Sequence, residues 1–170
     1  MKIYKHNPAA EIPAFATEGS AAFDLKACLT DGDKIRAFGP HNREIALPVR
    51  RATNGQMTVQ LMPQYRTLIP TGLIFDIPSK HVIKVYIRSS MALKFGLGLA
   101  NDVGIIDSDY VDPMYVMLYN MCDTPINIYH GDRIAQAMLE KTLTYTLAET
   151  SDIPEAKTDR TGGLGSTGVQ

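Results

Sequence analysis

The sequence is poor in the features that mark several large protein classes. It has no tryptophan, only two cysteines in 170 residues and a net charge of −1. Two cysteines cannot form a disulfide framework, and the spacing of Cys28 and Cys122 matches no metal-binding pair. A nearly neutral chain gives no bulk electrostatic case for binding nucleic acid or a membrane surface. These absences predict a reducing, cytoplasmic setting with two structural thiols.

Long apolar runs and clustered histidines are also missing. No run approaches the 18 residues expected of a membrane-spanning helix, and the N-terminus has no signal-peptide pattern. The four histidines are scattered, so a protein-ligated zinc site is not expected. What remains is ordinary, with 45% hydrophobic and 21% charged residues. This composition and length predict a single globular domain with a real core.

Short apolar stretches separated by turns dominate the chain. Residues 68–78 predict strand, turn and strand, residues 114–119 a buried strand, and Asn54-Gly55 a tight hairpin turn. Serines before residues 91–95, closed by Gly96, predict one short helix with a serine N-cap. About ten strands and one helix predict an all-β barrel or sandwich with a jelly-roll-like arrangement.

The stretch Asn101–Tyr110, N-D-V-G-I-I-D-S-D-Y, concentrates polar chemistry in ten residues. Its turn-forming residues and the pair Ile105-Ile106 predict a tight hairpin with an acidic end. Such a turn can present backbone N–H and C=O groups to a flat polar ligand. Asp107 follows two apolar residues, so we expect a partly desolvated carboxylate, which suits a general base. The alternative is an ordinary Asx-rich turn that ends a strand.

Three other places could serve an anionic ligand. The helix start carries an arginine and two serines, which suits phosphate oxygens, although a simple capped helix explains it equally. Asp24 follows small residues that allow close backbone approach, and Gln136 lies among apolar neighbours, where a structural hydrogen bond is the default explanation. The glycine-rich residues 160–168 could wrap a phosphate chain with their N–H groups, or could form a disordered tail.

Five stretches, taken together, resemble the trimeric dUTP diphosphatase (dUTPase) family. They run in the family's order over nearly the whole chain, and L-I-P-T-G-L is also in its place. The stretches are A-A-F-D-L-K-A with Asp24, R-S-S-M-A from Arg88, N-D-V-G-I-I-D-S-D-Y from Asn101, G-D-R-I-A-Q ending at Gln136, and R-T-G-G-L-G-S-T-G from Arg160.

The resemblance implies a distorted jelly-roll-like β-barrel of the β-clip type and a homotrimer with three shared active sites. Motifs one, two and four of each site would come from one subunit, motif three from a second and the glycine tail from the third. It also implies hydrolysis of dUTP to dUMP and pyrophosphate, with Mg²⁺ bound by the triphosphate. The expected division is a barrel domain over residues 1–147 and a flexible arm over residues 148–170.

The resemblance also assigns roles to residues. Asp107 would activate the attacking water, Asp24 would hold water of the metal shell or orient an arginine, and Tyr110 would lie under the deoxyribose. Backbone groups of the hairpin would contact uracil. The substrate-binding residues expected in this way are Arg88, Ser89, Ser90, Asn101, Gly104, Ile105, Ile106, Tyr110, Gln136, Arg160, Gly163, Leu164, Gly165, Ser166 and Thr167.

The chain departs from the family pattern in several places. Leu164 replaces the usual aromatic of the tail, the tail is one residue shorter after Arg160, and Ser90 replaces a glycine. Residues 111–114 replace the usual run after the tyrosine. Residues 38–62 resemble an inserted hairpin arm with a small arginine cluster, which could bind a protein partner. An added arm is common in viral members of the family, which is compatible with a phage origin.

Two other functions compete with dUTP hydrolysis. A dCTP deaminase shares the fold and an S-S-x-A motif, but its catalytic glutamate would fall at Leu118-Tyr119, where this chain has none. A regulatory nucleotide-binding protein acting through residues 38–62 belongs to a different class. The intact Asp107 argues against regulation as the only role.

Overall fold

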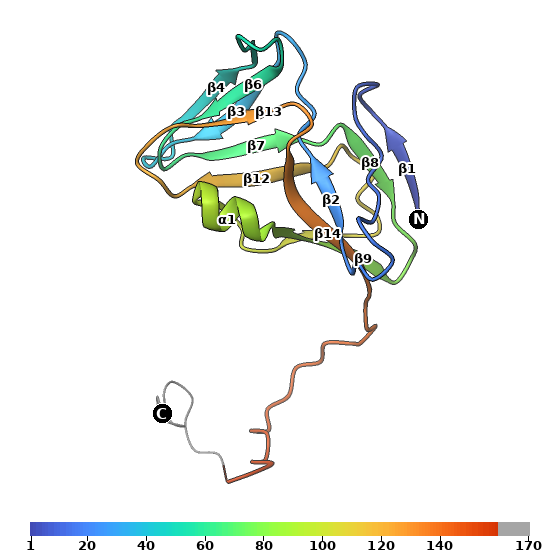
Figure 1. The fold of residues 1–170 in the computed structure, drawn as a ribbon. Helices are drawn as coiled ribbons and strands as arrows, with labels where there is room; N and C mark the ends of the chain where they lie inside the picture. Colours follow the sequence, from blue (N-terminus) through green and yellow to red (C-terminus); the bar gives the residue numbers. More distant parts are fainter. Residues whose placement is uncertain (160–170) are drawn as a thin grey trace.

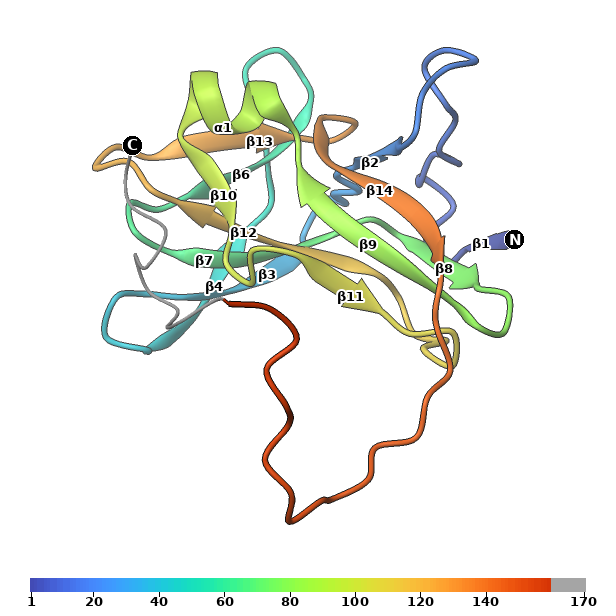
Figure 2. The same ribbon diagram turned by 90° about the horizontal axis from the view of Figure 1, so that it is seen from below.

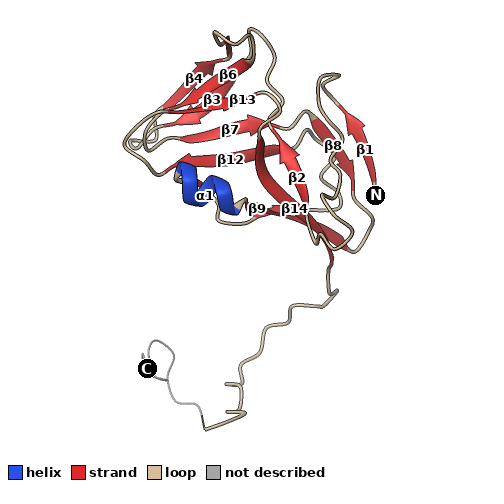
Figure 3. Cartoon of the chain, viewed as in Figure 1, coloured by secondary structure: helices blue, strands red, loops and turns tan. Residues whose placement is uncertain are grey.

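The computed structural model describes residues 1–159, which form fourteen strands and one helix (Figures 1 and 3). The elements in chain order are β1 (Lys2–Lys5), β2 (Phe23–Lys26), β3 (Lys34–Phe38), β4 (Glu44–Pro48), β5 (Arg50–Arg51), β6 (Met57–Leu61), β7 (Arg66–Pro70), β8 (Leu73–Asp76), β9 (His81–Ile87), α1 (Ser89–Phe95), β10 (Leu97–Leu99), β11 (Gly104–Ile106), β12 (Tyr115–Asn120), β13 (Ile126–Tyr129) and β14 (Arg133–Lys141).

The strands pair in antiparallel fashion in four sheets. Two larger sheets have the orders β10-β12-β7-β3-β4 and β11-β9-β14-β2, and two smaller ones have the orders β13-β6-β5 and β1-β8. Side chains from all four meet in one apolar core, among them Leu25, Val59, Ile69, Phe75 and Val116. Neighbouring strands within a sheet are mostly distant in the sequence, as in a jelly roll. The predicted all-β, jelly-roll-like class with one short helix is confirmed.

The continuous apolar run at 114–119 does not form a strand that is buried on both faces. Along β12, Val116 and Leu118 face the core, whereas Tyr115 and Met117 are 43% and 39% exposed. The prediction of a buried strand was wrong here because the barrel covers only one face of an antiparallel sheet. The other face of β12 presents large apolar side chains at the surface of the single chain.

Residues 38–62 form part of the barrel wall and not a projecting arm. β4 pairs with β3, and β6 pairs with β5 and β13. Leu47, Val59 and Leu61 from this segment are buried in the core. The predicted turn at Asn54-Gly55 is present, with Gly55 at φ +84°. Whether the segment is an insertion stays a prediction. Its turns and the outer residues of β4 and β5 are exposed, whereas its inward-facing side chains pack in the core.

Helix α1 begins without the serine cap that the sequence predicted. Arg88 occupies the N-cap position in an extended conformation, and its side chain makes no capping hydrogen bond. At the other end Gly96 closes the helix in the left-handed conformation and donates its N–H to the carbonyl of Ala92, as predicted. A Cβ atom at Gly96 would clash with Sγ of Cys122, so glycine is needed for space as well as conformation.

The chain leaves the barrel after β14. Thr142 donates its backbone N–H to the carbonyl of Lys80, and residues 142–159 then run away from the sheets without forming a helix or strand (Figures 1 and 2). Leu143, Leu147 and Ile153 are 88%, 87% and 92% exposed. The division at residue 147 stays a prediction, although the last barrel strand ends at Lys141. Among the residues that the structure describes, no helix is long and apolar enough to cross a membrane.

Candidate active site

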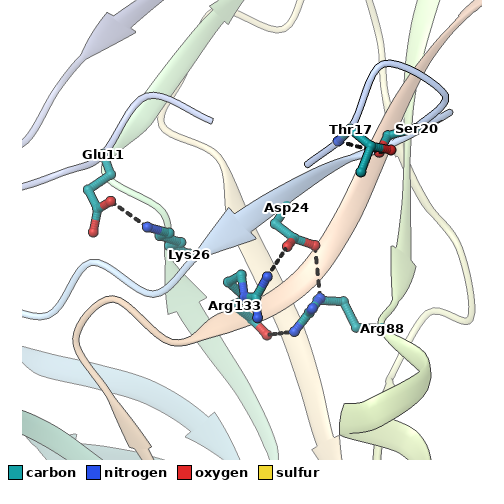
Figure 4. A network of polar contacts seen from close by, with 7 residues as sticks. All are labelled: Glu11, Thr17, Ser20, Asp24, Lys26, Arg88 and Arg133. Atoms are coloured by element: carbon teal, nitrogen blue, oxygen red, sulfur yellow. Dashed lines mark hydrogen bonds and ion pairs between the residues drawn. The ribbon is translucent and has the colours of Figure 1, made fainter. Parts of the chain in front are cut away.

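Asp24 lies between two arginines on the outer face of the β11-β9-β14-β2 sheet (Figure 4). Its Oδ1 is 2.8 Å from Nε of Arg88, and its Oδ2 is 3.2 Å from Nη1 of Arg133. Arg88 also donates from Nη1 to the backbone carbonyl of Arg133 at 3.2 Å. The aspartate therefore fixes both guanidinium groups and balances one of their two charges.

A bulge in β14 brings Arg133 and Gln136 to the same side of the sheet. The register between β14 and β2 shifts between Arg133 and Ala135, so that Ile134 and Ala135 are both buried. Strand residues normally alternate between faces, and residues three apart would then point in opposite directions. Because of the extra residue, Gln136 lies on the outer face, directly opposite Asp24.

A cavity of about 360 Å³ brings together four of the predicted site residues. Asp24, Arg88, Ser89 and Gln136 line it together with Arg133 and small residues of the segment before β2. Gln136 also donates from Nε2 to the carbonyl of Ile87 at 3.2 Å, so the structural hydrogen bond considered from the sequence is present. We refer to this group as the arginine cavity.

Ser90 lies apart from the arginine cavity. It lines a separate hollow of about 220 Å³ with Met91, Phe95 and Asn127, and Arg88 and Arg133 border both spaces. The prediction grouped Ser90 with Ser89, but the first turn of α1 directs neighbouring residues to different sides. Conversely, Arg133 lines the arginine cavity but was not predicted as a site residue, although it lies inside the G-D-R-I-A-Q stretch.

Most of the predicted base-binding residues line a second cavity, of about 260 Å³. Asn101, Gly104, Ile105, Ile106 and Tyr110 all contribute to it. Val85, Leu99, Met114, Tyr115 and Met117 are among its other lining residues, and we refer to it as the turn cavity.

The turn before β11 is not a hairpin, contrary to the prediction. β10 pairs with β12 and β11 pairs with β9, so residues 100–103 cross between the two larger sheets. Asp102 adopts the left-handed conformation at φ +57°, and Val103 donates its N–H to the carbonyl of Asn101 at 2.6 Å. β11 is then an edge strand of its sheet. An edge strand has backbone N–H and C=O groups that are free to pair with a ligand.

Asp107 is exposed in the single chain and lines neither cavity. The expected partial desolvation of its carboxylate is therefore absent within one chain, because the turn places it at the end of β11. Nearby, Tyr110 donates its hydroxyl to the carbonyl of Pro113 at 3.1 Å. Burial, followed by the charge of Asp112 and by Tyr115, raises the pKa of Tyr110. The phenol is thus a neutral group at the rim of the turn cavity.

The two cavities share no lining residue and lie on opposite faces of one sheet. Gln136 pairs with Tyr86 and faces outward, whereas Val85 is buried, faces the core and lines the turn cavity. Because the sheet lies between them, one nucleotide could not contact both cavities of a single chain. The remaining predicted residues, Arg160, Gly163, Leu164, Gly165, Ser166 and Thr167, lie outside the described residues.

The described part of the chain contains no group of three or more His, Cys, Asp or Glu side chains that could hold a metal ion. Both oxygens of Asp24 already contact guanidinium groups. A carboxylate offers about four acceptor positions, so Asp24 can still accept a hydrogen bond from a water molecule. Asp24 therefore fits a metal ion that is approached through a water molecule.

Comparison with known proteins identifies the family. The family model described as dUTPase matches residues 53–168. The chain belongs to the dUTPase family. The deoxyuridine 5'-triphosphate nucleotidohydrolase of Rhizobium rhizogenes is 32% identical over 164 residues, which are 96% of this chain and 89% of that protein. The enzyme of the same name from Dinoroseobacter shibae is 35% identical, covering 92% of this chain and 87% of its own length.

Solved dUTPase structures share the fold. A point mutant of the Staphylococcus bacteriophage 80alpha dUTPase, solved with dUpNHpp, has a TM-score of 0.73 at 19% identity, covering 99% of this chain and 98% of that one. The Streptococcus mutans dUTPase has a TM-score of 0.61 at 23% identity, covering 79% and 88% of the two chains. The segment matched to the dUTPase family model contains Arg88, Asp107 and Gln136 but begins after Asp24.

Proposed function

We propose that this chain is a dUTP diphosphatase that hydrolyses dUTP to dUMP and pyrophosphate. The reaction limits uracil in DNA and supplies dUMP for dTMP synthesis. One observation carries the proposal. In a chain of the dUTPase family, Asp24 holds Arg88 and Arg133 beside Ser89 and Gln136 in one cavity. Hydrolysis of a triphosphate depends mainly on positioning and on stabilising charge, which such a cluster supplies.

The arginine cavity is proposed to bind the triphosphate. Two guanidinium groups share one carboxylate, so the cluster keeps one net positive charge for an anionic ligand. Ser89 adds a hydroxyl donor and Gln136 an amide donor at the same cavity. Arg160 and the donors of residues 163–167 are proposed to complete the phosphate contacts from the tail.

Asp107 is proposed as the general base. Its carboxylate takes a proton from a water molecule, and the water oxygen forms a bond to the α-phosphorus. The bond between that phosphorus and the oxygen bridging to the β-phosphate breaks, and pyrophosphate leaves with the bonding electrons. The exposed position of Asp107 in one chain supports a site that a second copy closes, because burial by the partner would provide the dry environment the reaction needs.

The turn cavity is proposed to bind the nucleoside. Free backbone groups of edge strand β11 and of the turn from Asn101 would pair with the uracil edge. The ring of Tyr110, held by the carbonyl of Pro113, would lie under the deoxyribose and exclude a ribose 2′-hydroxyl. Gly104 allows β11 to lie close to β9 beside this cavity, since a Cβ atom there would lie 3.0 Å from the Cβ of Val85.

A homotrimer with shared sites is proposed for the assembly. The arginine cavity and the turn cavity lie on opposite faces of one sheet, which supports a site built from two copies. The exposed apolar face of β12, with Tyr115 and Met117, supports contact with another copy. The tail of a third copy would then cover the triphosphate.

Mg²⁺ is proposed as an ion that enters with the triphosphate. It commonly keeps several water molecules and binds substrate phosphates, and it neutralises phosphate charge when bound. Asp24 would accept a hydrogen bond from a water molecule of the ion. The protein's own contribution is the fixed orientation of Arg88 and Arg133.

We propose that the protein works in the cytoplasm and that the exposed arginines within residues 38–62 could bind a protein partner. Cys28 is a buried thiol whose pKa is raised, mainly by burial, which suits a structural cysteine. Arg43, Arg50 and Arg51 within residues 38–62 are exposed, and this is the surface proposed for a partner. Neither the charge nor the fold suggests nucleic acid as a ligand.

A panel of nucleotides tests the proposed function. Purified protein with Mg²⁺ is incubated with dUTP, dCTP, dTTP and UTP, and both pyrophosphate and ammonia are measured. We expect pyrophosphate from dUTP far faster than from the other three. Ammonia released from dCTP would replace the proposal with the deaminase. Nucleotide binding without any product would favour a regulatory protein.

A further inference from the structure

Three side chains form a row across the outer face of the sheet that carries the arginine cavity. Gln136 on β14 pairs directly with Asp24 on β2 and with Tyr86 on β9. Directly paired residues of antiparallel strands project to the same face, with Cβ atoms about 4.5–5.5 Å apart. The row therefore runs from the arginine cluster through Gln136 to Tyr86.

Tyr86 lies at the end of this row, and neither the sequence motifs nor the site described above gives it a role. It is half-buried, while its neighbour Val85 faces the core. Within the described part of the chain, no hydrogen bond involves the Tyr86 hydroxyl, and no direct role follows from the sequence motifs. Lys84, two residues earlier on the same face, is already paired with Glu140 at 2.6 Å. The hydroxyl of Tyr86 is thus a hydrogen-bond donor beside Gln136 that is available to a ligand.

We propose that Tyr86 is a further substrate-binding residue, whose hydroxyl donates a hydrogen bond to a phosphate oxygen of the bound nucleotide. The inference rests on the proposed function, which puts the triphosphate at Arg88, Ser89 and Gln136. Adjacent strands are about 4.8 Å apart, a distance that a tyrosine side chain can span. A phosphate at Gln136 is therefore within reach of the phenol.

The chemistry of the row favours a phosphate over the base or the sugar. Tyr86 pairs with Gln136, which lines the arginine cavity proposed for the triphosphate, whereas the turn cavity of the same chain lies on the opposite face. Gln136 already uses one N–H on the carbonyl of Ile87, which leaves its remaining N–H for the ligand. The Tyr86 hydroxyl would add a second donor beside the single free N–H of Gln136, and a phosphate group has several oxygens that can accept.

The substitution Tyr86→Phe tests the proposal because it removes only the hydroxyl. Binding of dUpNHpp and of deoxyuridine is measured by calorimetry with Mg²⁺, together with the steady-state kinetics of dUTP hydrolysis. We expect about tenfold weaker binding of dUpNHpp and unchanged binding of deoxyuridine, as for the loss of one hydrogen bond to a charged group. KM for dUTP should rise by a similar factor while kcat and the melting temperature stay unchanged.

The matched control is Tyr4→Phe, at an exposed tyrosine of edge strand β1, which should change none of these values. Unchanged affinity of Tyr86→Phe for dUpNHpp would overturn the inference. So would an equal loss for dUpNHpp and deoxyuridine, because that result places the hydroxyl at the nucleoside. A wild-type protein that neither binds dUpNHpp nor hydrolyses dUTP would instead refute the proposed function, and with it the basis of this inference.

Discussion

Replacing Asp24 by asparagine should weaken the contacts that hold Arg88 and Arg133 in position. The substitution keeps the size of the side chain but removes its charge and one acceptor oxygen. Arg88 would lose a charge-assisted hydrogen bond of 2.8 Å between side chains that are each 22% exposed. Arg133, which is 54% exposed and 3.2 Å away, would lose a weaker contact. Two neighbouring guanidinium charges would then lack a counter-charge.

The structural effect of Asp24→Asn can be estimated. A hydrogen bond to a charged group contributes about 1.5–3 kcal/mol, and the remaining amide oxygen offsets part of the loss. A decrease in stability of about 1–2 kcal/mol corresponds to a melting temperature about 2–8 °C lower for a chain of this size. The catalytic effect should be larger, because a displaced phosphate contact of about 1 Å can cost about 100-fold in rate.

Two assays check this prediction, pyrophosphate release from dUTP and thermal unfolding. The control is Glu44→Gln, which breaks an exposed pair of the same length, 2.8 Å, between Glu44 and Arg36. That variant should keep wild-type activity and melting temperature, since an exposed pair contributes little. If Asp24→Asn retained full kcat/KM, the arginine cavity would not be the phosphate site and the reasoning would be refuted.

Three other substitutions or truncations test separate parts of the account. Asp107→Asn should abolish turnover but retain binding of dUpNHpp by calorimetry; retained turnover would remove Asp107 from its role as base. Truncation after Leu147 should strongly reduce hydrolysis without lowering the melting temperature of the barrel, and an unchanged rate would leave the tail without a catalytic role. Gly96→Ala should destabilise the fold by about 2 kcal/mol in urea unfolding, because of its positive φ and the contact with Cys122; an unchanged midpoint would contradict this explanation.

The sequence predicted the class of fold because period-two patterns and turn residues report local structure directly. Gly96 and Gly55 occupy the left-handed positions that their turns require. The pairing of strands could not be predicted in the same way. The stretch from Asn101 looks like a hairpin locally, yet its two flanking strands belong to different sheets. Pairing depends on partners that are distant in the sequence, and no local pattern specifies them.

Only part of the candidate site could be predicted from the sequence, again because strand pairing brings together residues that are distant in the sequence. Motifs identified Asp24, Arg88 and Gln136, which the fold brings into one cavity. Arg133 and Tyr86 became apparent only through the register of β14 and its bulge. Asp107 lies at an exposed position, and no property of a single chain reveals what would cover it.

Mixing two inactive variants tests most directly whether this dUTPase-family chain hydrolyses dUTP at a site shared between copies. Asp24→Asn and Asp107→Asn proteins are denatured, combined in equal amounts and refolded, and pyrophosphate release from dUTP is compared with that of each variant refolded alone. If Asp24 and Asp107 of one site come from different copies, random assembly leaves about a quarter of the sites intact, so activity should recover to about a quarter of the wild-type value. A mixture no more active than its separate components would contradict the account.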